Sequence, residues 1–238
     1  MDAPVMRLPC SGKLAATRHG ICPEKFMIYE IRTYDLKPKS QPEVEKRFAE
    51  AYEKRKAFSQ LAAFWHTEIG PLNQIIHVWP YQDLEERARI RAAAVQSGHW
   101  PPRIGEFVIN MQSEIFMPFD ISPEIRPGNM GPYFEIRTYT YATGELAKLQ
   151  QSWGRAIPER TKISPLVGLW YSELGGLNRF THIWAYTSLN HRTEARNQAV
   201  AAGVWPPSVV AQKAGLPDPV LTAQENKIVM PAAFSPLQ

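Results

Sequence analysis

The sequence predicts an α+β protein made of two tandem copies of one unit, in the order strand, helix, strand, strand, helix, strand. The first observation is an internal repeat, because HVWPYQDLEERARIR from His77 resembles HIWAYTSLNHRTEAR from His182, and 182 − 77 gives an offset of 105 residues. At this offset, 17 of the 38 residues in the range 65–102 are identical to their partners, which indicates a tandem duplication. The second observation is that strand-like and helix-like periodicities follow one another in the same order in both copies.

The first strand and the first helix of copy one each have their own pattern. Residues 27–35 contain an alternating run of β-branched and aromatic residues, which predicts a strand. A helix is predicted to follow because Ser40 and Glu43 have the spacing of a capping box, in which the serine hydroxyl caps the first turn. The apolar residues that recur at four-residue intervals along this helix are Val44, Phe48 and Tyr52.

The remaining elements of copy one complete the unit. Strands are predicted around 61–69 and 73–81, joined by the turn GPLN, which GGLN matches in the second copy. A second helix is predicted to begin at Asp83, where Glu86 completes a capping box. A fourth strand is predicted at 106–117. The resulting βαββαβ order is that of a ferredoxin-like unit.

The second copy differs from the first at two places. Its first helix contains Pro158, and a proline at this point is expected to kink or end the helix. The register also changes near the C-terminus, because FMP at 116–118 matches VMP at 229–231 at an offset of 113. About eight extra residues are therefore expected in the loop at 212–219. The apolar stripe of the helix consists of Leu146, Leu149, Trp153 and Ile157.

These patterns divide the chain into a tail at 1–26, a first repeat at 27–117, a linker at 118–132 and a second repeat at 133–231. The tail has no secretory apolar region and is expected to be disordered or to precede the native start. In each repeat both helices should lie on one face of a four-stranded sheet, which leaves the other face uncovered. Two such faces can cover each other, so the repeats are expected to pack as one intramolecular barrel.

Composition excludes several classes of protein. The net charge is only +4, from 27 basic and 23 acidic residues that do not form runs, so no nucleic-acid partner is expected. No run of 18 apolar residues occurs, so a soluble protein without a transmembrane segment is expected. The two cysteines, Cys10 and Cys22, both lie in the tail, which predicts no disulfide framework and favours a reducing, cytoplasmic location. No metal site is predicted, because zinc-binding signatures are absent.

The repeated motifs taken together resemble those of the NIPSNAP family, a branch of the dimeric α+β-barrel superfamily. They are EIRTY, WxxExGxLN, HxWxYxxLxxRxxxR and WPP, each present in both copies, and the resemblance covers residues 27–231. It implies the barrel fold and, in a eukaryote, a mitochondrial location. A homo-dimer or larger assembly is expected as well. The resemblance implies no agreed chemistry, although the wider superfamily contains cofactor-independent monooxygenases, haem-degrading enzymes and isomerases.

The candidate catalytic residues are the two repeated histidines, His77 and His182, because imidazole titrates near neutral pH and serves as a general acid or base. Glu68 and Glu173 are expected to set their protonation. A structural interpretation stands beside this one: the same side chains would form a buried polar network that fixes the docking of the two halves.

The candidate ligand-binding residues come from neighbouring strands and from the second helix of each repeat. On the first strand three polar residues share one face, and the third strand should place His77 and Trp79 beside them. Arginines on the second helix are expected either to pair with Glu68 or Glu30, or to hold a carboxylate or phosphate. The full set is Glu30, Arg32, Tyr34, Trp79, Arg87, Arg91, Arg137, Trp184, Arg192 and Arg196.

Two functional interpretations remain open at this level. The first is a non-catalytic binding or adaptor module that contacts protein partners. The alternative is a cofactor-independent monooxygenase or isomerase that acts on a hydrophobic or anionic compound in a pocket lined by His, Glu, Arg and Trp. No cofactor is expected, and haem coordinated by His77 or His182 is a minor alternative. A solvent-accessible cavity beside a histidine would favour the enzyme, whereas a filled, dry interface would favour the module.

Overall fold

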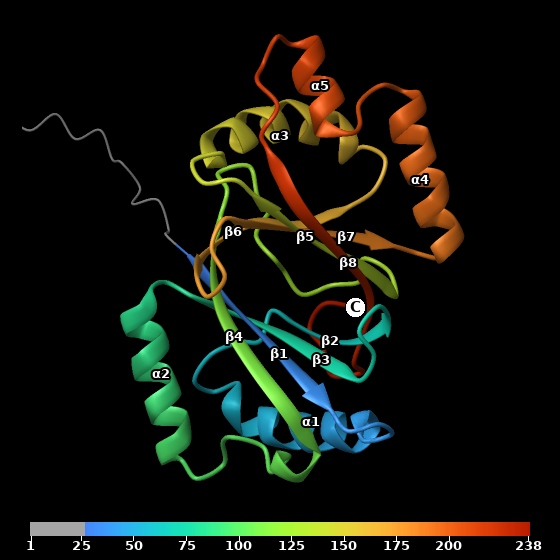
Figure 1. The fold of residues 1–238 in the computed structure, drawn as a ribbon. Coiled ribbons are helices and arrows are strands. Elements are labelled where there is room, and N and C mark those ends of the chain that lie inside the picture. Colours follow the sequence, from blue (N-terminus) through green and yellow to red (C-terminus); the bar gives the residue numbers. More distant parts are fainter. Residues whose placement is uncertain (1–26) are drawn as a thin grey trace, which may run out of the picture.

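The computed structural model describes residues 27–238, so the expected tail at 1–26 lies outside the described residues. Each repeat has the predicted βαββαβ order, and the second repeat adds the short helix α5 (Figure 1). The first repeat contains β1 (Ile28–Leu36), α1 (Gln41–Arg55), β2 (Ala63–Ile69), β3 (Gln74–Tyr81), α2 (Leu84–Gln96), a 3-10 turn (Gly105–Phe107) and β4 (Val108–Pro118). The second contains β5 (Tyr133–Tyr141), α3 (Leu146–Arg160), β6 (Leu166–Leu174), β7 (Arg179–Tyr186), α4 (Leu189–Ala201), α5 (Pro207–Lys213) and β8 (Leu221–Pro231).

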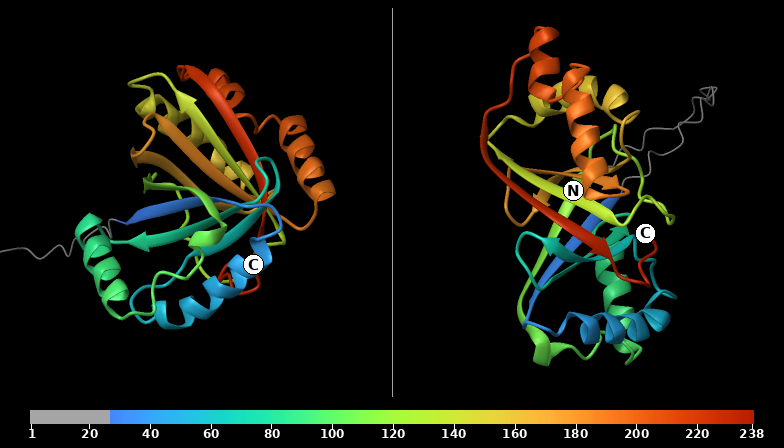
Figure 2. Two further views of the ribbon diagram at one scale, coloured as in Figure 1. Left: turned by 60° about the horizontal axis from the view of Figure 1, so that its bottom comes forward. Right: turned by 90° about the vertical axis from the view of Figure 1, so that its right-hand side faces the viewer.

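The strands form one closed antiparallel barrel in the order β1-β3-β2-β8-β5-β7-β6-β4. Helices α1 and α2 cover the first repeat, and α3, α4 and α5 cover the second on the opposite side (Figure 1). The views in Figure 2 keep the strands between these two helical layers. The predicted fold class, two ferredoxin-like repeats packed as an intramolecular barrel, is therefore confirmed.

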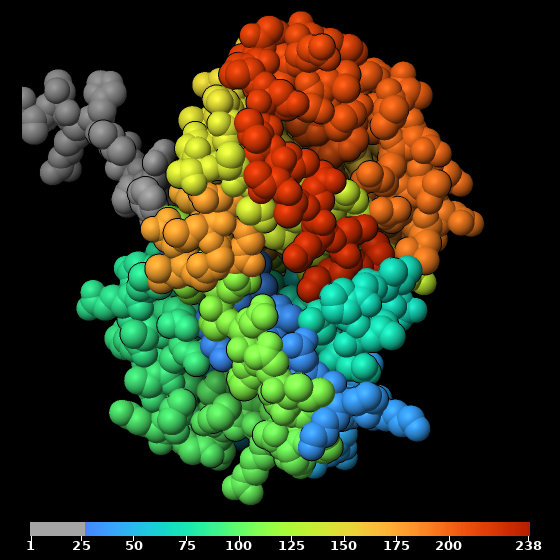
Figure 3. Space-filling view, in the orientation of Figure 1, coloured from blue at the N-terminus to red at the C-terminus, as the bar shows by residue number. Residues whose placement is uncertain are grey.

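The barrel closes because the last strand of each repeat is shared between both repeats. Most of β4 pairs with β1, but its end, from Ile115 to Pro118, pairs with β6. In the same way β8 pairs with β5 and then, from Ile228 to Pro231, with β2. The space-filling view shows the red β8 descending from the orange second repeat to the blue-green first repeat (Figure 3).

Beyond each shared strand the chain continues over the other repeat. The Ser122 hydroxyl accepts a hydrogen bond from the Leu169 amide of β6 at 2.9 Å, and the Ser235 hydroxyl accepts one from the Phe64 amide of β2 at 2.9 Å. The Phe234 ring lies 4.7 Å from the Phe64 ring. Each repeat therefore holds a terminal segment of its partner.

The barrel interior is apolar. Its buried side chains come from both repeats and include Trp65, Phe116, Phe134, Trp170 and Val229. Two further apolar clusters lie outside the barrel wall, one beneath the helices of each repeat. The helix-facing side of each sheet therefore has a core of its own, separate from the interior.

The Ser40 cap and an end of the helix at Pro158 were wrong predictions, and the Asp83 cap is confirmed. Ser40 does not cap α1, because its hydroxyl donates to the Lys37 carbonyl at 2.6 Å. Helix α3 continues through Pro158 to Arg160, since Ile157 and Arg160 are buried and the last turn packs on the sheet. At the start of α2, Asp83 accepts a hydrogen bond from the Glu86 amide at 2.7 Å, as the capping box predicted.

Candidate functional site

The predicted polar residues meet on the helix-facing side of each sheet. In the first repeat β1 pairs with β3 so that Arg32 lies opposite His77 and Glu30 lies opposite Trp79. The His77 ring lies 4.9 Å from the ring of Phe48, which belongs to α1. The site is thus enclosed between one sheet and its own helices. The expectation that this network fixes the docking of the two halves is wrong, because the joint between them is the apolar barrel interior.

Glu30 is the centre of the first-repeat site. Its side chain is fully buried, and its Oε1 accepts hydrogen bonds from Arg87 at 2.7 Å, Arg32 at 2.8 Å and Ser113 at 2.6 Å. Arg91 lies 3.7 Å from the same oxygen. Burial alone would raise the pKa of Glu30, but the hydrogen bonds from Arg87 and Ser113 outweigh burial and lower the pKa to about 2.

Glu135 has the same place in the second repeat. It accepts hydrogen bonds from Arg137 at 2.9 Å and from Arg192 at 2.5 Å, and Arg196 lies 3.9 Å away. Burial opposes ionisation, yet the hydrogen bond from Arg192 and the charge of Arg137 hold the pKa of Glu135 below its ordinary value. In both repeats, arginines of the second helix therefore pair with the buried carboxylate of the first strand.

Glu68 and Glu173 lie elsewhere. Both are exposed, near the ends of β2 and β6, and neither is among the charged groups that influence His77 or His182. The prediction that they set the protonation of the histidines is wrong. Residue type and spacing gave no sign that these positions lie on the solvent side of the strand end.

The two histidines are neutral hydrogen-bond acceptors. His77 Nδ1 accepts a hydrogen bond from Trp79 Nε1 at 2.6 Å, and His182 Nδ1 accepts one from Trp184 Nε1 at 2.8 Å. The proton of each neutral ring is therefore on Nε2, which is buried and has no hydrogen-bond partner among residues 27–238. Burial, reinforced by the charge of the neighbouring strand arginine, lowers the pKa of both histidines well below the ordinary value.

Neither ring is arranged for metal binding. His77 Nε2 is buried, and the Phe48 and Phe64 ring centres lie 4.9 Å and 5.6 Å from the imidazole. No cluster of three or more His, Cys, Asp or Glu side chains that could hold a metal ion occurs in the described part of the chain. The haem alternative gains no support from this geometry.

Sequence patterns did not predict a role for Arg55 or for its counterpart Arg160. The signal that could have identified them is the repeat, because the offset of 105 places an arginine at both positions. Arg55 ends α1 and is only 2% exposed. Its guanidinium lies 4.7 Å from the Trp79 ring centre and 5.6 Å from that of Trp100, donates to Ser59, and has no ion-pair partner in the described chain. Burial lowers the pKa of Arg55, because the cation has lost water without gaining a carboxylate.

A cavity of about 510 Å³ opens beside these groups in the first repeat, and we call it the first-repeat cavity. Its charged lining consists of three arginines, and its apolar lining is largely aromatic. Its lining includes Arg32, Arg55, Arg91, Tyr34, His77, Phe48, Trp79, Trp100 and Met111.

The corresponding second-repeat cavity is smaller, about 310 Å³. Arg137, Arg196, Tyr139 and Trp205 line it in place of Arg32, Arg91, Tyr34 and Trp100. The counterparts of Arg55, His77 and Trp79 do not line it. The duplicated sequence has therefore produced two related but unequal cavities.

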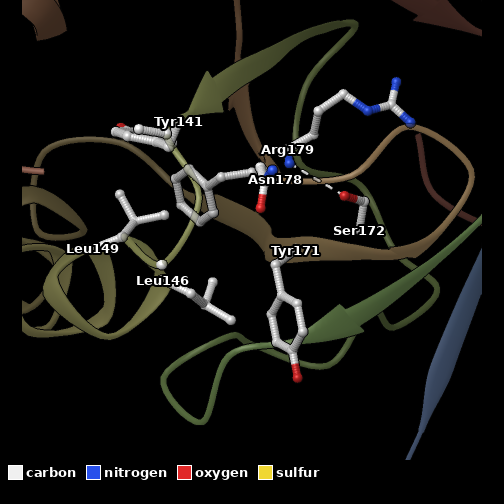
Figure 4. Close-up of a pocket in the computed structure, with 10 residues that line it drawn as sticks. Tyr141, Leu146, Leu149, Tyr171, Ser172, Asn178 and Arg179 are labelled. Carbon is white, nitrogen blue, oxygen red and sulfur yellow. Dashed lines mark hydrogen bonds between the residues drawn. The ribbon is translucent and has the colours of Figure 1, made fainter. Parts of the chain in front are cut away.

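A third hollow, of about 90 Å³, lies beside the β6–β7 turn of the second repeat (Figure 4). The Arg179 side chain points away from its aromatic wall in Figure 4, and its guanidinium pairs with Glu114 across the repeat boundary. Arg179 is therefore engaged in an ion pair, and the Ser172 hydroxyl accepts from the Arg179 amide. The small volume of this hollow makes it a packing defect instead of a candidate site.

The fold defines a class of protein, an α+β barrel that two βαββαβ repeats of one chain build together. A solved anthrone oxidase-like protein has this fold, with a TM-score of 0.57 and 10% identity over 88% of this chain and 92% of that chain. The NIPSNAP family model matches residues 29–123 and 134–236, and the chain therefore belongs to the NIPSNAP family.

Curated relatives agree with this assignment. A NipSnap homolog of Dictyostelium discoideum is 28% identical over 215 residues, which cover 87% of this chain and 88% of the relative. Human NipSnap homolog 3A is 28% identical over 220 residues, covering 89% of this chain and 86% of the relative. The family identified from the repeated motifs is confirmed. Among the described residues, no helix has the length and apolar character needed to cross a membrane.

Proposed function

We propose that the chain is a small-molecule-binding protein whose first-repeat cavity takes an organic anion, namely a carboxylate with an apolar body. The observation that carries the proposal is an excess of buried positive charge. At or beside this cavity lie four guanidinium groups, three of which share the carboxylate of Glu30, while the fourth has no carboxylate partner among the described residues. They belong to Arg32, Arg55, Arg87 and Arg91.

The excess charge favours an anionic occupant because burying unpaired guanidinium groups is costly. Glu30 supplies one negative charge for these groups, and the Nε atoms of Arg55 and Arg87 are buried without a hydrogen-bond partner in the described chain. The guanidinium of Arg91 lies 3.7 Å from the Glu30 carboxylate, which is too far for a hydrogen bond, and its side chain is about one third exposed. Its planar donor groups can therefore bind a ligand carboxylate at the cavity mouth.

The apolar walls of the first-repeat cavity indicate what the rest of the ligand, apart from its carboxylate, should be. Phe48, Trp79, Trp100 and Met111 present aromatic and thioether surfaces, which suit a flat or branched apolar body. The Tyr34 hydroxyl accepts from Arg32 Nε at 2.7 Å, so its own hydrogen remains available to a ligand oxygen.

Binding is favoured over acid–base catalysis by the state of the histidine. A general base works best when its pKa is near the operating pH, and burial holds the pKa of His77 well below that range. The cavity itself favours a small ligand over the adaptor interpretation. Contact with protein partners, a homo-dimer, and a cytoplasmic or mitochondrial location stay predictions.

The test compares acids with their neutral amides. Isothermal titration of the full chain with 3-phenylpropanoate, indole-3-acetate and octanoate should detect binding of at least one acid, at least tenfold tighter than its amide. Arg91→Gln should weaken that binding about tenfold, which corresponds to about 1.4 kcal/mol. Arg196→Gln, the matched change in the other repeat, should leave it unchanged. Equal affinity for acid and amide, no binding of any of the three acids, or an unaffected Arg91→Gln protein would contradict the proposal.

A further inference from the structure

We infer that the second-repeat cavity is a separate binding site for a smaller, hydroxylated carboxylate, so that one chain holds two unlike anions. The inference rests on the same charge argument as the proposed function, but it concerns a different cavity and a different ligand class. Its basis is a set of substitutions between residues that the duplication makes equivalent.

The charged half of the second site matches that of the first. Glu135 is fully buried and is the one carboxylate shared by Arg137, Arg192 and Arg196, and the Nε of Arg192 is buried without a hydrogen-bond partner in the described chain. Arg137 and Arg196 line the cavity. An anion is therefore the expected occupant here too.

The apolar half is reduced in size. Trp153 replaces Phe48 and lies 5.2 Å from Trp205, and Tyr141 stands where the first repeat has Leu36. Both changes add aromatic volume at the wall, and the cavity is about 310 Å³ instead of about 510 Å³. The second-repeat cavity therefore leaves less room for an aromatic ligand body than the first-repeat cavity does.

The remaining lining is more polar. At the offset of 113, Gln224 replaces Met111 of the first-repeat cavity, and two hydroxyl-bearing residues, Ser152 and Ser208, also line the second-repeat cavity. Asp218, from the extra loop that the second repeat alone possesses, adds a carboxylate to the rim. Amide and hydroxyl groups donate to and accept from hydroxyls, and a carboxylate accepts from them.

These features together define the ligand chemistry. The arginines bind one carboxylate, and the opposite wall offers hydrogen bonds to several hydroxyls instead of an apolar surface. Asp218 disfavours a second negative charge at the rim. The volume corresponds to about ten water molecules of about 30 Å³ each, which accommodates a hydroxy acid of roughly four to six carbons.

Gluconate and hexanoate are the probes, because they have the same chain length and differ in their hydroxyls. In titrations of the full chain, gluconate should bind at least tenfold tighter than hexanoate to the site that Arg196→Gln weakens. Gln224→Met, an exposed change that restores the first-repeat residue, should remove most of this preference while leaving the melting temperature unchanged. Arg91→Gln should not affect gluconate.

Native mass spectrometry with gluconate and 3-phenylpropanoate together should show both ligands on one chain. Mutual displacement, no gluconate binding, or gluconate binding that Arg196→Gln does not weaken would overturn the inference. The two proposals fail separately. If the chain binds gluconate but none of the three acids with an apolar body, the first-repeat proposal is wrong. If it binds one of those acids but not gluconate, the second-repeat proposal is wrong.

Discussion

At the scale of single residues, the duplicated histidine is a structural acceptor in both repeats. Its Nδ1 satisfies the indole N–H of Trp79 or Trp184, and burial holds the ring neutral. Glu30 and Glu135 have the opposite character, because they stay ionised in the folded protein through their arginine partners. Both kinds of group link the stability of the fold to pH.

The free energy of unfolding should fall in two steps as the solution is acidified. The histidine pKa is lower in the folded than in the unfolded chain, so the stabilisation is complete above the ordinary value of 6.5 and is lost below it. Each histidine contributes a slope of up to about 1.4 kcal/mol per pH unit. Below about pH 4.5 the carboxylates add their own loss, which for Glu30 continues to about pH 2.

Urea denaturation between pH 7.5 and 4.5 measures this effect. His77→Asn keeps an acceptor for the Trp79 indole and removes one titrating group. The free energy of unfolding should then depend less steeply on pH between 6.5 and 4.5, by the equivalent of about one bound proton. An unchanged slope in this variant would mean that His77 is protonated in the folded chain.

At the scale of elements, the segments after β4 and β8 fasten the two repeats together. Ser122 and Ser235 are equivalent at the offset of 113, and each caps a backbone amide of the other repeat's second strand, Leu169 in β6 and Phe64 in β2. Across the same boundary, Glu114 pairs with Arg179, while its counterpart Lys227 donates to Gln74 at 3.0 Å. The serine bonds to backbone amides are therefore equivalent in the two repeats, whereas the ion pair at one boundary is replaced by an amine–amide hydrogen bond at the other.

Ser235→Ala should lower the free energy of unfolding by about 1–3 kcal/mol, because the buried Phe64 amide loses the Ser235 hydroxyl as its acceptor. Chemical denaturation measures the loss. Thr222→Ala serves as the control, since its exposed hydroxyl bonds the Thr140 carbonyl and should contribute little. Equal losses in the two variants would show that the terminal segment does not depend on this bond.

At the scale of the whole molecule, one apolar interior is shared by two half-barrels. Trp65 of the first repeat packs against Phe134 of the second at 5.4 Å, and Tyr29 stacks on Trp170 at 4.6 Å. Neither sheet buries this face within its own repeat. The duplication thereby supplies within one chain the partner that a single repeat would need from a second copy.

Residues 27–131 expressed alone should therefore form a dimer through the exposed inner face of the sheet. Sedimentation velocity at micromolar concentration tests this, with the full chain as the reference. A monomeric fragment that unfolds cooperatively would contradict the shared-core account, since it would show that one helix-facing core suffices.

Several features followed from the sequence because they depend on local order. Strand and helix periodicity and the Asp83 cap follow from short-range patterns. The expectation that the first and third strands are neighbours came from the fold class, and the structure shows the register that places Arg32 opposite His77. Helix ends were less predictable. Pro158 stays inside α3 because packing of the last turn outweighs one lost hydrogen bond, and Ser40 satisfies a nearby carbonyl in place of the cap.

By itself, the sequence determined the duplication, the βαββαβ order, the family and the residue types that meet on each strand. Only the tertiary structure decided that the polar face turns toward the helices and the apolar face toward the other repeat, that Glu30 instead of Glu68 receives the arginines, and that Arg55 is buried beside a cavity. The physical reason is that both faces of each sheet are buried. The alternation of side chains along a strand shows which residues share a face, but it does not show whether the helices or the other repeat cover that face. Long-range packing determines this.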